Sequence, residues 1–474
     1  MQGGSLHFQG DKIKERILKL FWSLDSRVAL HLLWVLSVFS RHARRLYPRM
    51  ESVVEGLRSK QVPSAQAKVL HGSYGGSVAF LFHSLGYYHP SGYAVRSHAI
   101  LDSVQWHGVT VSAAVRPGYP WDLADSCDEE RHESIEYRGI YFRLFPGSEA
   151  TLADPESTYI EVYAQDAAKF VTDTASSLLH ASSNYLNGSA AAIAGQRLGI
   201  PAVYEVRGLW HLTRAFYFPS YKGSDHYRYC EKRELEACHG VDHVITLSDA
   251  LKGWLVDRGI SAEKVTVVGN AAPAKVSVTV PEDQVQELRQ YHGLGEYRPV
   301  IGYMGSLVEY EGLDRLITLM AETAPTQRPW LVIAGEGKAR QAMMKQAQRM
   351  GVAGDVVFAG RVAPEQVAAY YALFDAAALP RRDSELTRLV PPIKPFEIVA
   401  HGCPLLVSEP VEAALGSTLT QGYAAVDFDA LDGMEQLLKR AAEVPTMPEA
   451  VPTWNERGAE LVGVYRLFEE ELDY

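Results

Sequence analysis

The stretch LVPPIKPFEIVAHGCPLLVS, residues 389–408, contains the features that decide the fold. Lys394 is crowded by three prolines, which fix φ and restrict the residues before them: Pro391, Pro392 and Pro395. Glu397 stands in the first turn of an expected helix, and the apolar run after Pro404 is typical of a buried strand. This order predicts a helix followed by a strand, with a charged pair held rigidly at one end.

Short apolar runs alternate with helix-like stretches along most of the chain. Before residue 271 the expected strands are 78–85, 108–115, 140–146, 177–182, 202–207 and 243–248. After residue 283 they are 299–306, 330–337, 356–362, 375–380 and 404–410. Helices are expected between several of them, for example over 93–105 and 190–198. Such alternation implies parallel sheets that are covered by helices on both faces.

An Ala/Pro/Val-rich stretch at 271–283 interrupts this pattern and divides it in two. We therefore predict an α/β protein with two doubly wound, Rossmann-like domains, residues 66–275 and 276–450, that face a cleft. Ligands are expected at the carboxyl ends of the strands. Residues 451–474 should contain a helix over 459–472 that crosses back to the first domain.

The composition narrows the classes of function. The chain has 474 residues, of which 47% are apolar and 22% charged, as in ordinary globular proteins. Its four cysteines include no CxxC pair, which argues against a disulfide framework and a zinc site and favours a reducing compartment. The net charge of −11 argues against nucleic acid as the main partner.

Residues 1–65 form a basic extension, whose charge and apolar pattern differ from those of the rest of the chain. Residues 1–50 hold nine Lys or Arg against three acidic residues, and apolar positions recur there at helical spacing. The apolar run 28–39 is shorter than the ~20 residues of a membrane-spanning helix, and it lacks a signal-peptide cleavage site. Either residues 12–49 lie on an anionic membrane surface, or they pack as a helical hairpin on the domain behind them. The expected location is cytoplasmic, on the inner membrane face in the first case.

Four cations follow the expected strand 375–380 within fourteen residues: Arg381, Arg382, Arg388 and Lys394. Arginine forks suit phosphate and lysine adds a point charge, so this grouping favours an anionic ligand over a solvated surface loop. Glu397 is near enough to accept hydrogen bonds from the vicinal hydroxyls of a sugar. Its alternative role is to stabilise the helix N-terminus.

Several residues at strand ends of the first domain are further candidates. Gly92 and Tyr93 open the helix after the first strand, where backbone N–H groups can approach an anion, although glycine also serves turn geometry. Glu205 and Arg207 end the strand 202–207. They either contact a ligand or form a salt bridge between the two domains. His180 and Asn184 lie at another strand end and either touch an acceptor or serve the structure.

Three segments together resemble glycosyltransferase family 4: 198–210 (LGIPAVYEVRGLW), 240–270 and 379–408. Members of this family are retaining, nucleotide-sugar-dependent enzymes of the GT-B fold, and the resemblance spans residues 76–470. It is nearest to the bacterial branch that builds exopolysaccharides. The first 65 residues lie outside it.

The resemblance implies roles for individual residues. Glu397 would hold the ribose hydroxyls of the donor, and Lys394 with the preceding arginines would hold its diphosphate. The strand-end loops at Gly305, Ser306 and Gly335 would line the donor, and Gly360, Arg361 and Val362 would line the base. Arg207, Lys394 and Arg382 are then the predicted catalytic residues, because stabilising the leaving diphosphate is mainly electrostatic.

The chain departs from the family pattern at three places. Leu389 stands where a first glutamate is expected, eight residues before Glu397, so that contact is absent or comes from Glu385. The loop 305–312 has Ser306 and Glu311 in place of an arginine and a lysine. Arg207 stands where a histidine is common. These departures shift roles among the residues of the site, and no general base is identified.

We predict a glycosyltransferase that uses a nucleoside diphosphate sugar, UDP- or GDP-linked, as co-substrate and requires no metal. Its acceptor would be a glycan or lipid-linked glycan in cell-surface polysaccharide synthesis. Two alternatives stay open: an inactive scaffold that binds nucleotide or glycan, and a sugar-nucleotide 2-epimerase. The second needs a set of acid and base side chains around the cleft that the sequence does not show.

Overall fold

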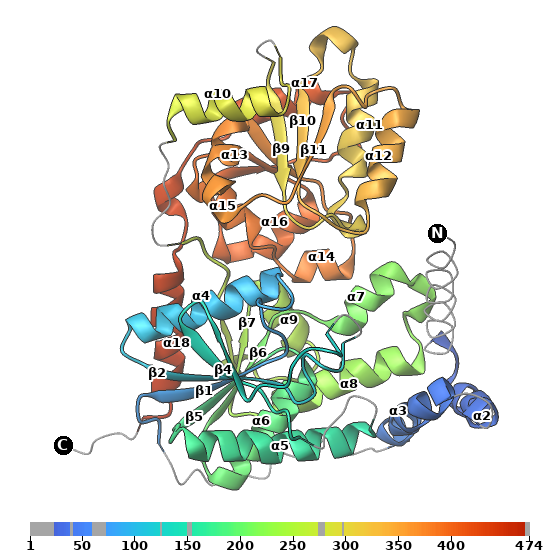
Figure 1. Cartoon of the computed structure of the whole chain (residues 1–474), viewed down its shortest axis with the longest axis vertical. Coiled ribbons are helices and arrows are strands. Elements are labelled where there is room, and N and C mark those ends of the chain that lie inside the picture. Colours follow the sequence, from blue (N-terminus) through green and yellow to red (C-terminus); the bar gives the residue numbers. More distant parts are fainter. Residues whose placement is uncertain are drawn as a thin grey trace. The chain divides into compact units, whose positions relative to one another are not determined.

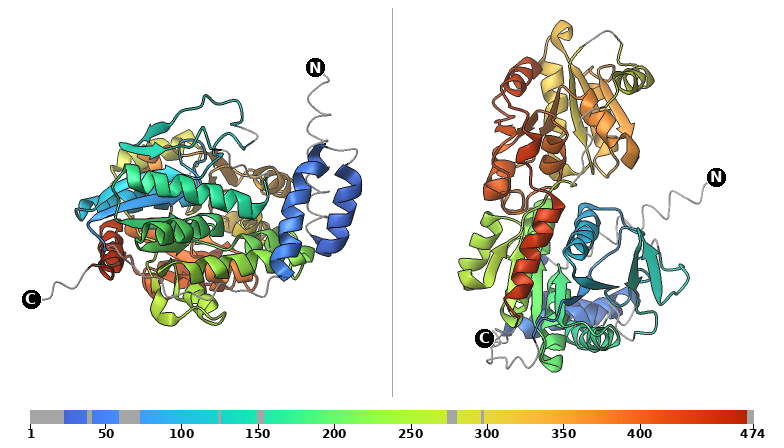
Figure 2. Two further views of the ribbon diagram at one scale, coloured as in Figure 1. Left: turned by 90° about the horizontal axis from the view of Figure 1, so that it is seen from below. Right: turned by 90° about the vertical axis from the view of Figure 1, so that its left-hand side faces the viewer.

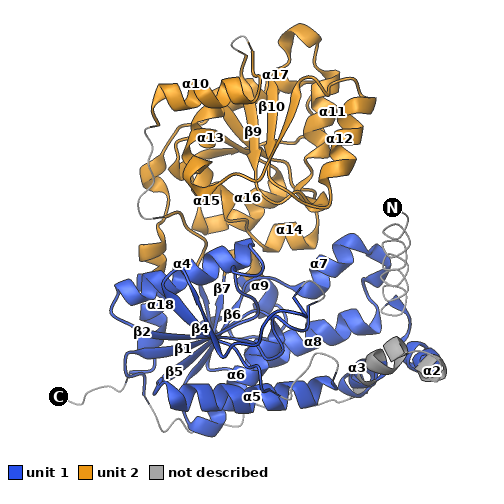
Figure 3. Ribbon diagram, viewed as in Figure 1, with its two compact units in different colours: residues 1–246, 252–267, 459–474 blue, residues 247–251, 268–458 orange. Residues whose placement is uncertain are grey.

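The structure is a computed structural model, and it describes residues 23–37, 41–58, 73–123, 126–148, 154–273, 280–295 and 298–469 (Figure 1). The chain forms two compact units (Figure 3). Unit 1 consists of residues 1–246, 252–267 and 459–474, and unit 2 of residues 247–251 and 268–458. The unit boundaries thus lie at 267/268 and 458/459, whereas the sequence pattern placed the domain limits at 275/276 and 450/451.

Unit 1 is built on a sheet with the order β3-β4-β2-β1-β5-β6-β7-β8. Its strands are β1 (Ser77–Phe82), β2 (Thr110–Val115), β3 (Ser134–Tyr137), β4 (Ile140–Arg143), β5 (Leu178–Ser182), β6 (Ala202–Val206), β7 (His243–Thr246) and β8 (Val265–Val267). Only β3 pairs antiparallel among these strands; the other pairs are parallel. Central strands such as β5 and β6 are buried along their whole length, as the continuous apolar runs predicted.

Helices cover this sheet in unit 1. They are α4 (Gly92–Trp106), α5 (Glu156–Asp173), α6 (Tyr185–Leu198), α7 (Trp210–Tyr217) and α8 (Asp225–Gly240). The short α9 (Asp249–Val256) contains the crossing at residue 251. Helix α18 (Trp454–Arg466) begins five residues before the predicted start, and its residues from 459 onward belong to unit 1 (red in Figure 2). Tyr465 of α18 places its Oη 2.7 Å from Nδ1 of His180 in β5.

Unit 2 contains a second, wholly parallel sheet with the order β11-β10-β9-β12-β13-β14. Its strands are β9 (Val300–Met304), β10 (Trp330–Ala334), β11 (Val356–Gly360), β12 (Ala376–Leu379), β13 (Leu405–Val407) and β14 (Tyr423–Ala425). Its helices are α10 (Glu282–Tyr291), α11 (Asp314–Glu322), α12 (Arg340–Arg349), α13 (Val367–Leu373), α14 (Glu385–Leu389), α15 (Lys394–Ala400), α16 (Glu409–Leu415) and α17 (Met434–Ala442). Two doubly wound sheets confirm the predicted fold class.

The N-terminal extension contributes two described helices, α2 (Ser26–Ser37) and α3 (Arg41–Arg58), that pack on unit 1. Ala29, Leu33, Met50 and Val53 form a small apolar core with Tyr229 and Cys230 of α8. Lys232 also donates from Nζ to the Gly56 carbonyl over 2.6 Å. The described part of the extension therefore packs as a hairpin, which was one of the two open explanations.

Contact between the extension and a membrane stays a prediction. Val28 and Leu32 of α2 are 51% and 40% exposed. The predicted basic face at residues 12–22 lies outside the described residues. Within the described part of the chain, no helix is both long and apolar enough to cross a membrane.

Candidate functional site

Three glycines lie at the carboxyl ends of neighbouring strands in unit 2. Gly305, Gly335 and Gly360 follow or end β9, β10 and β11, with φ values of +149°, +135° and +75°. Gly335 donates its N–H to the Gly360 carbonyl over 2.6 Å. A Cβ on Gly335 would lie 1.8 Å from the Gly305 carbonyl oxygen, and a Cβ on Gly305 only 2.1 Å from Cε of Lys394. Only glycine fits this cradle, because both the dihedral angles and the close approach exclude a side chain.

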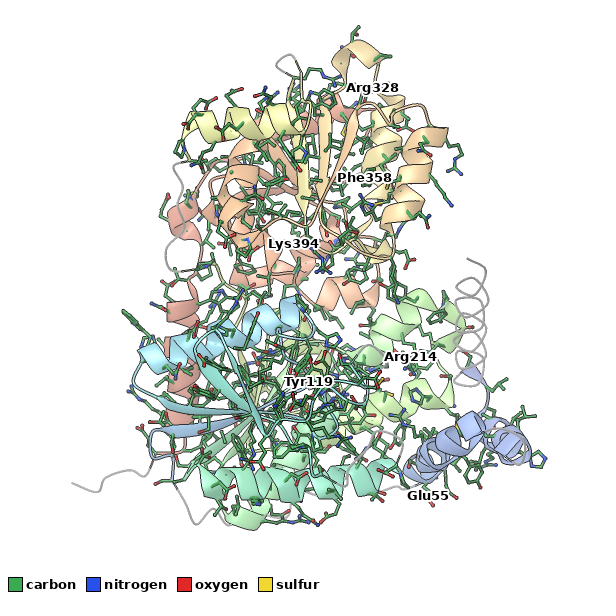
Figure 4. The ribbon with its side chains drawn as sticks, in the orientation of Figure 1. Glu55, Tyr119, Arg214, Arg328, Phe358 and Lys394 are labelled. Carbon is green, nitrogen blue, oxygen red and sulfur yellow. The ribbon has the colours of Figure 1, made fainter. Side chains whose placement is uncertain are left out.

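Lys394 is the first residue of α15 and is followed by Pro395. The helix therefore begins at the lysine, three residues before Glu397. Its Nζ lies 3.0 Å from Oε1 of Glu311, and Nη2 of Arg381 lies 2.9 Å from the same oxygen. The Lys394 ammonium also stands 5.0 Å from the ring centroid of Tyr303. Glu311 is 2% exposed and the Lys394 side chain 16%. Figure 4 labels Lys394 in this part of unit 2.

The electrostatics of this group follow from two cations on one carboxylate. Burial alone would raise the pKa of Glu311, but Arg381 and Lys394 outweigh it and hold the pKa at about 2. Burial lowers the pKa of Lys394, and the Glu311 carboxylate opposes this shift. Glu311 Oε2 and Arg381 Nε are buried without a hydrogen-bond partner among the described residues. The group therefore carries a net positive charge and unused hydrogen-bonding capacity.

Glu397 lies one turn after Lys394 on the same face of α15. Burial raises the pKa of its carboxyl, although Lys394 opposes the shift. Ser306 and Arg361 are exposed and Val362 is half-buried, and their contact with the donor stays a prediction. Tyr303 Oη donates to the Ser306 carbonyl over 2.9 Å and fixes the loop after β9.

The other two predicted arginines have different partners. Arg382 pairs with Asp314, and both side chains are half-exposed. Arg388 bonds Asp383 at 2.6 and 2.9 Å and Glu409 at 2.9 and 2.7 Å. Of the four predicted cations, the structure therefore brings Arg381 and Lys394 together on one carboxylate among the described residues. Arg388 is held by surface carboxylates instead.

A second charged cluster lies inside unit 1, around Glu205 at the end of β6. Arg96 Nη2 lies 2.7 Å from its Oε1, and Arg207 Nη2 lies 2.6 Å from its Oε2. Burial would raise the pKa of Glu205, but Arg207 and Arg96 outweigh it and hold the pKa well below its usual range. Arg96 was missed by sequence reasoning, because a single arginine within a helix gives no signal of its partner.

Most of the remaining groups of this cluster are paired within unit 1, whereas His180 Nε2 lies 3.5 Å from Glu205 Oε2 and has no hydrogen-bond partner among the described residues. Arg207 donates from Nη1 to Ser97 Oγ over 2.6 Å and to the Tyr93 carbonyl over 3.1 Å. His180 bonds Tyr465, as described above. The structure thus buries Glu205 and His180 completely and Arg207 almost completely, instead of exposing them to phosphate or acceptor. The physical reason is that a buried carboxylate requires both guanidinium groups; contact of Glu205, Arg207 and His180 with the donor or the acceptor stays a prediction.

Gly92 and Asn184 have different surroundings. Gly92 is exposed at the first residue of α4, whose N-cap Ser91 accepts from the Ala94 N–H over 3.3 Å. Asn184 precedes α6 and is buried, yet neither Oδ1 nor Nδ2 has a hydrogen-bond partner among the described residues. Such an amide is rare in native proteins.

Two family models match the chain, one in each unit. A glycosyl transferase 4-like domain matches residues 91–271, and a glycosyl transferases group 1 model matches residues 284–420. Together they cover most of the two sheets described above. The chain belongs to the group 1 glycosyltransferases of family 4. The predicted family is thus confirmed, whereas the exopolysaccharide branch remains a prediction.

Curated relatives of this glycosyltransferase match over part of their length. An alpha-monoglucosyldiacylglycerol synthase of Streptococcus pneumoniae is 26% identical over 172 residues, 35% of this chain and 39% of the relative. An alpha-D-kanosaminyltransferase of Streptomyces kanamyceticus is 26% identical over 214 residues, 44% and 55%. A GDP-mannose-dependent alpha-(1-6)-phosphatidylinositol monomannoside mannosyltransferase of Mycobacterium tuberculosis is 37% identical over 97 residues, 20% and 25%. The chain spans less than two thirds of each of these relatives.

Solved structures show the same fold for the family 4 chain. A sucrose-phosphate synthase of Thermosynechococcus elongatus matches with a TM-score of 0.62 at 16% identity, over 82% of this chain and 98% of that one. Anabaena HepE in complex with UDP and glucose matches with a TM-score of 0.56 at 16% identity, over 82% and 98%. These likenesses identify the GT-B fold.

One pattern in this glycosyltransferase was overlooked at the level of sequence: Asp427 and Asp429 form an Asp-x-Asp pair, which in sugar-nucleotide enzymes often holds a divalent metal. Asp429 pairs with Arg315, and Asp427 Oδ1 accepts the Asp429 N–H over 3.0 Å. No group of three or more metal-ligating side chains occurs among the described residues. The absence of a metal requirement stays a prediction.

Proposed function

We propose that this chain transfers a sugar from a nucleoside diphosphate sugar to a hydroxyl group of a glycan or lipid-linked acceptor, with retention of configuration. The observation that carries this proposal is the group of Lys394, Arg381 and Glu311 next to the glycine cradle. Its net positive charge and its unpaired Arg381 Nε suit a diphosphate. The close approach of the Gly335 and Gly305 backbones, and of Gly305 to the Lys394 side chain, holds this cation at the carboxyl ends of β9 and β10.

The chemistry of the transfer follows from these positions. The bond between the anomeric carbon and the diphosphate oxygen breaks while the acceptor oxygen bonds to that carbon, and the acceptor proton passes to the leaving diphosphate. Lys394 and Arg381 stabilise the charge that develops on the diphosphate. Glu397, on the same helix face as Lys394, accepts hydrogen bonds from the ribose hydroxyls and so aligns the donor.

The printed functions of the relatives support the substrate classes. One is named as the synthase of a glucosylated diacylglycerol, and another as a GDP-mannose-dependent phosphatidylinositol monomannoside mannosyltransferase. Anabaena HepE was solved with UDP-glucose. We therefore propose a UDP- or GDP-sugar as donor and a cell-surface polysaccharide or glycolipid intermediate as acceptor. The proposed location is the inner face of the cytoplasmic membrane.

The test is a thermal-shift and hydrolysis screen of the full chain against UDP-, GDP-, ADP- and dTDP-sugars. At 100 times its dissociation constant the correct donor adds about 2.7 kcal/mol of stability. Lys394→Ala and Glu397→Ala should abolish this gain, whereas Lys345→Ala, an exposed lysine of α12, should keep it. If no nucleotide sugar stabilises the protein, or if all three variants respond like the wild type, the proposed donor site is wrong.

A scaffold that binds the donor without transferring sugar is the second candidate. Leu389 supports it, because this residue is buried at the position where a first glutamate is expected. Stabilisation by a nucleotide sugar without hydrolysis of that sugar and without transfer to any glycan would favour this candidate.

A further inference from the structure

Unit 1 contains a cavity of about 160 Å³ outside the Glu205 cluster. Its lining comes from α3, α5, α6, α7 and α8 and from the end of β1. The lining includes two arginines, two histidines, an asparagine and a tryptophan: Arg49, Arg214, His83, His211, Asn184 and Trp210. Figure 4 labels Arg214 on α7. A cavity of ~150 Å³ holds a ligand the size of a benzene ring, so this one accepts a single ring-sized group.

The cavity wall presents polar atoms that lack partners. Both side-chain atoms of Asn184, Nδ1 of His83 and Nε2 of His211 are buried without a hydrogen bond among the described residues. Native proteins rarely leave such atoms unpaired, because the loss of hydration is not compensated. Several in one cavity therefore indicate a ligand that bonds them.

The histidines meet that ligand as neutral rings. Burial lowers the pKa of His211 to about 3 and that of His83 well below its usual range, and neighbouring arginines add to both shifts. A neutral imidazole offers one donor and one acceptor, and the Asn184 amide offers both as well. This set of groups matches hydroxyls, which also donate and accept.

The charge of the cavity comes from two arginines. Arg49 of α3 and Arg214 of α7 form no ion pair with a carboxylate in the described part of the chain; Arg214 Nη1 lies 3.4 Å from His226 Nδ1. Glu156, an acid of the lining, is balanced by Arg233 at 3.0 Å. Asp154, the other acid of the lining, balances at most one of the two arginines.

Glu156 also accepts the hydroxyls of Tyr185 and Tyr229, at 2.7 and 2.6 Å, so its oxygens are occupied. The two arginines therefore leave the cavity with unbalanced positive charge. Trp210, 47% exposed, adds an apolar ring surface to the lining and stands edge-on to His83, with centroids 4.8 Å apart.

We infer that this cavity binds the acceptor through one polyhydroxyl ring that carries an anionic substituent, a carboxylate or a phosphate. Asn184, His83 and His211 bond the hydroxyls, and Arg49 and Arg214 bond the anion. This inference rests on the proposed function, since it names the class of acceptor. Arg49 belongs to the hairpin of α2 and α3, which lies outside both matched family models, so the hairpin adds a specificity of this chain.

The first experiment titrates glucose, glucuronate and glucose 6-phosphate into the full chain by calorimetry. Either anion should bind about tenfold or more tightly than glucose, because hydrogen bonds to charged groups are stronger than neutral ones. Arg49→Gln and Arg214→Gln should each weaken the binding of the anions about tenfold and leave glucose unchanged. Arg27→Gln, an exposed arginine of the same hairpin outside the cavity lining, is the matched control. Equal affinity for glucose, or an equal loss in Arg27→Gln, overturns the inference.

The second experiment separates ligand binding from a structural role. Asn184→Leu removes an unpaired buried amide at similar size, so the melting temperature should stay the same or rise while the affinity for glucuronate and glucose 6-phosphate falls. A lower melting temperature with unchanged affinity would show that the amide serves the fold, and the inference would then be wrong.

The third experiment distinguishes two sources of the anionic ring. Vesicles of phosphatidylinositol and of phosphatidylcholine are compared in sedimentation with the same variants. Binding to the first alone, lost in Arg49→Gln and Arg214→Gln, assigns the ring to a lipid headgroup; binding of the soluble ring anions without vesicle binding assigns it to a glycan. If a nucleotide sugar stabilises the protein and no ring anion binds in any form, the inference fails and the proposed function stands. If ring anions bind and no nucleotide sugar does, the proposed function fails and the cavity remains a binding site.

Discussion

The two units each bury a glutamate between two cations at the end of a sheet, and the two groups differ in how completely they are satisfied. Around Glu205 in unit 1, Arg96 and Arg207 meet the carboxylate, and Ser182 donates to the same Oε2 over 3.1 Å. Around Glu311 in unit 2, one carboxylate oxygen and one guanidinium N–H remain unpaired, and the lysine is partly exposed.

The pairing of the carboxylate oxygens distinguishes the two clusters. A buried carboxylate with both oxygens paired, such as Glu205, makes the fold rigid, because any opening would leave a charge unpaired. A charged group whose carboxylate oxygen and guanidinium N–H are unpaired, such as that of Glu311 and Arg381, can form hydrogen bonds to a ligand. By this criterion we expect Glu205 to brace unit 1 and the Glu311 group to be the proposed donor site.

The largest predicted loss of stability is that of Glu205→Gln in unit 1. The change leaves Arg96 and Arg207 buried without a counter-charge, and we expect a loss of about 3–5 kcal/mol in the free energy of unfolding. Urea unfolding followed by hydrogen exchange on peptides of unit 1 measures it. Glu161→Gln is the control, because Glu161 pairs with Arg197 on the surface and should contribute less than about 1 kcal/mol. Similar losses in both variants would refute a bracing role for Glu205.

The pH dependence of unit 2 should reveal Glu311. Its folded pKa of about 2 lies below the usual 4.5, so the stabilisation is fully present above pH 4.5 and is lost as the pH falls toward 2. The shift corresponds to about 3 kcal/mol. Hydrogen exchange of unit 2 peptides across this range should show a shallower slope in Glu311→Gln, with the residual slope due to other carboxylates. An unchanged slope would mean that Glu311 is not held ionised by Lys394 and Arg381.

A somewhat smaller effect on stability is expected for Gly335→Ala. Its Cβ would meet the Gly305 carbonyl, and alanine at φ +135° is strained, so the strand ends must separate at a cost of about 1–3 kcal/mol. Donor affinity should fall with it, since the cradle no longer closes. Gly354→Ala, whose Cβ would meet no atom within 4 Å, serves as control. Unchanged donor affinity in Gly335→Ala would exclude the cradle from the donor site.

The smallest effect belongs to Arg388→Gln. Its two ion pairs are on the surface, where solvent screening leaves little net stabilisation. We expect a change in transfer rate of less than about twofold, by comparison with wild type in a donor-saturated assay. A loss of tenfold or more would show that Arg388 leaves its carboxylates to bind the donor, as its place in the sequence predicted.

The fold could be predicted further than the site. Apolar runs of five or six residues such as β1 and β10 were found, because a strand buried on both faces has no polar alternation. The strands β3, β8 and β14 were missed because they are short and, unlike the similarly short β13, are not entirely buried, so no continuous apolar run marked them. The prolines around Lys394 indicated a held lysine, and in the structure its ammonium pairs with Glu311 while the side chain stays 16% exposed. Its partner Glu311 lies 83 residues away, so sequence reasoning could treat that glutamate only as a departure.

The place of α18 also matters while the protein is being made. Unit 2 is synthesised between the two main parts of unit 1, and it can complete its core before residues 459–469 have left the ribosome. In contrast, His180 can bond Tyr465 only after a further 285 residues have been synthesised. The Tyr74 N–H likewise cannot donate to the Phe468 carbonyl until the end of the chain has been made. Although domains generally fold in the order of translation, we expect unit 1 of this chain to complete its packing after unit 2.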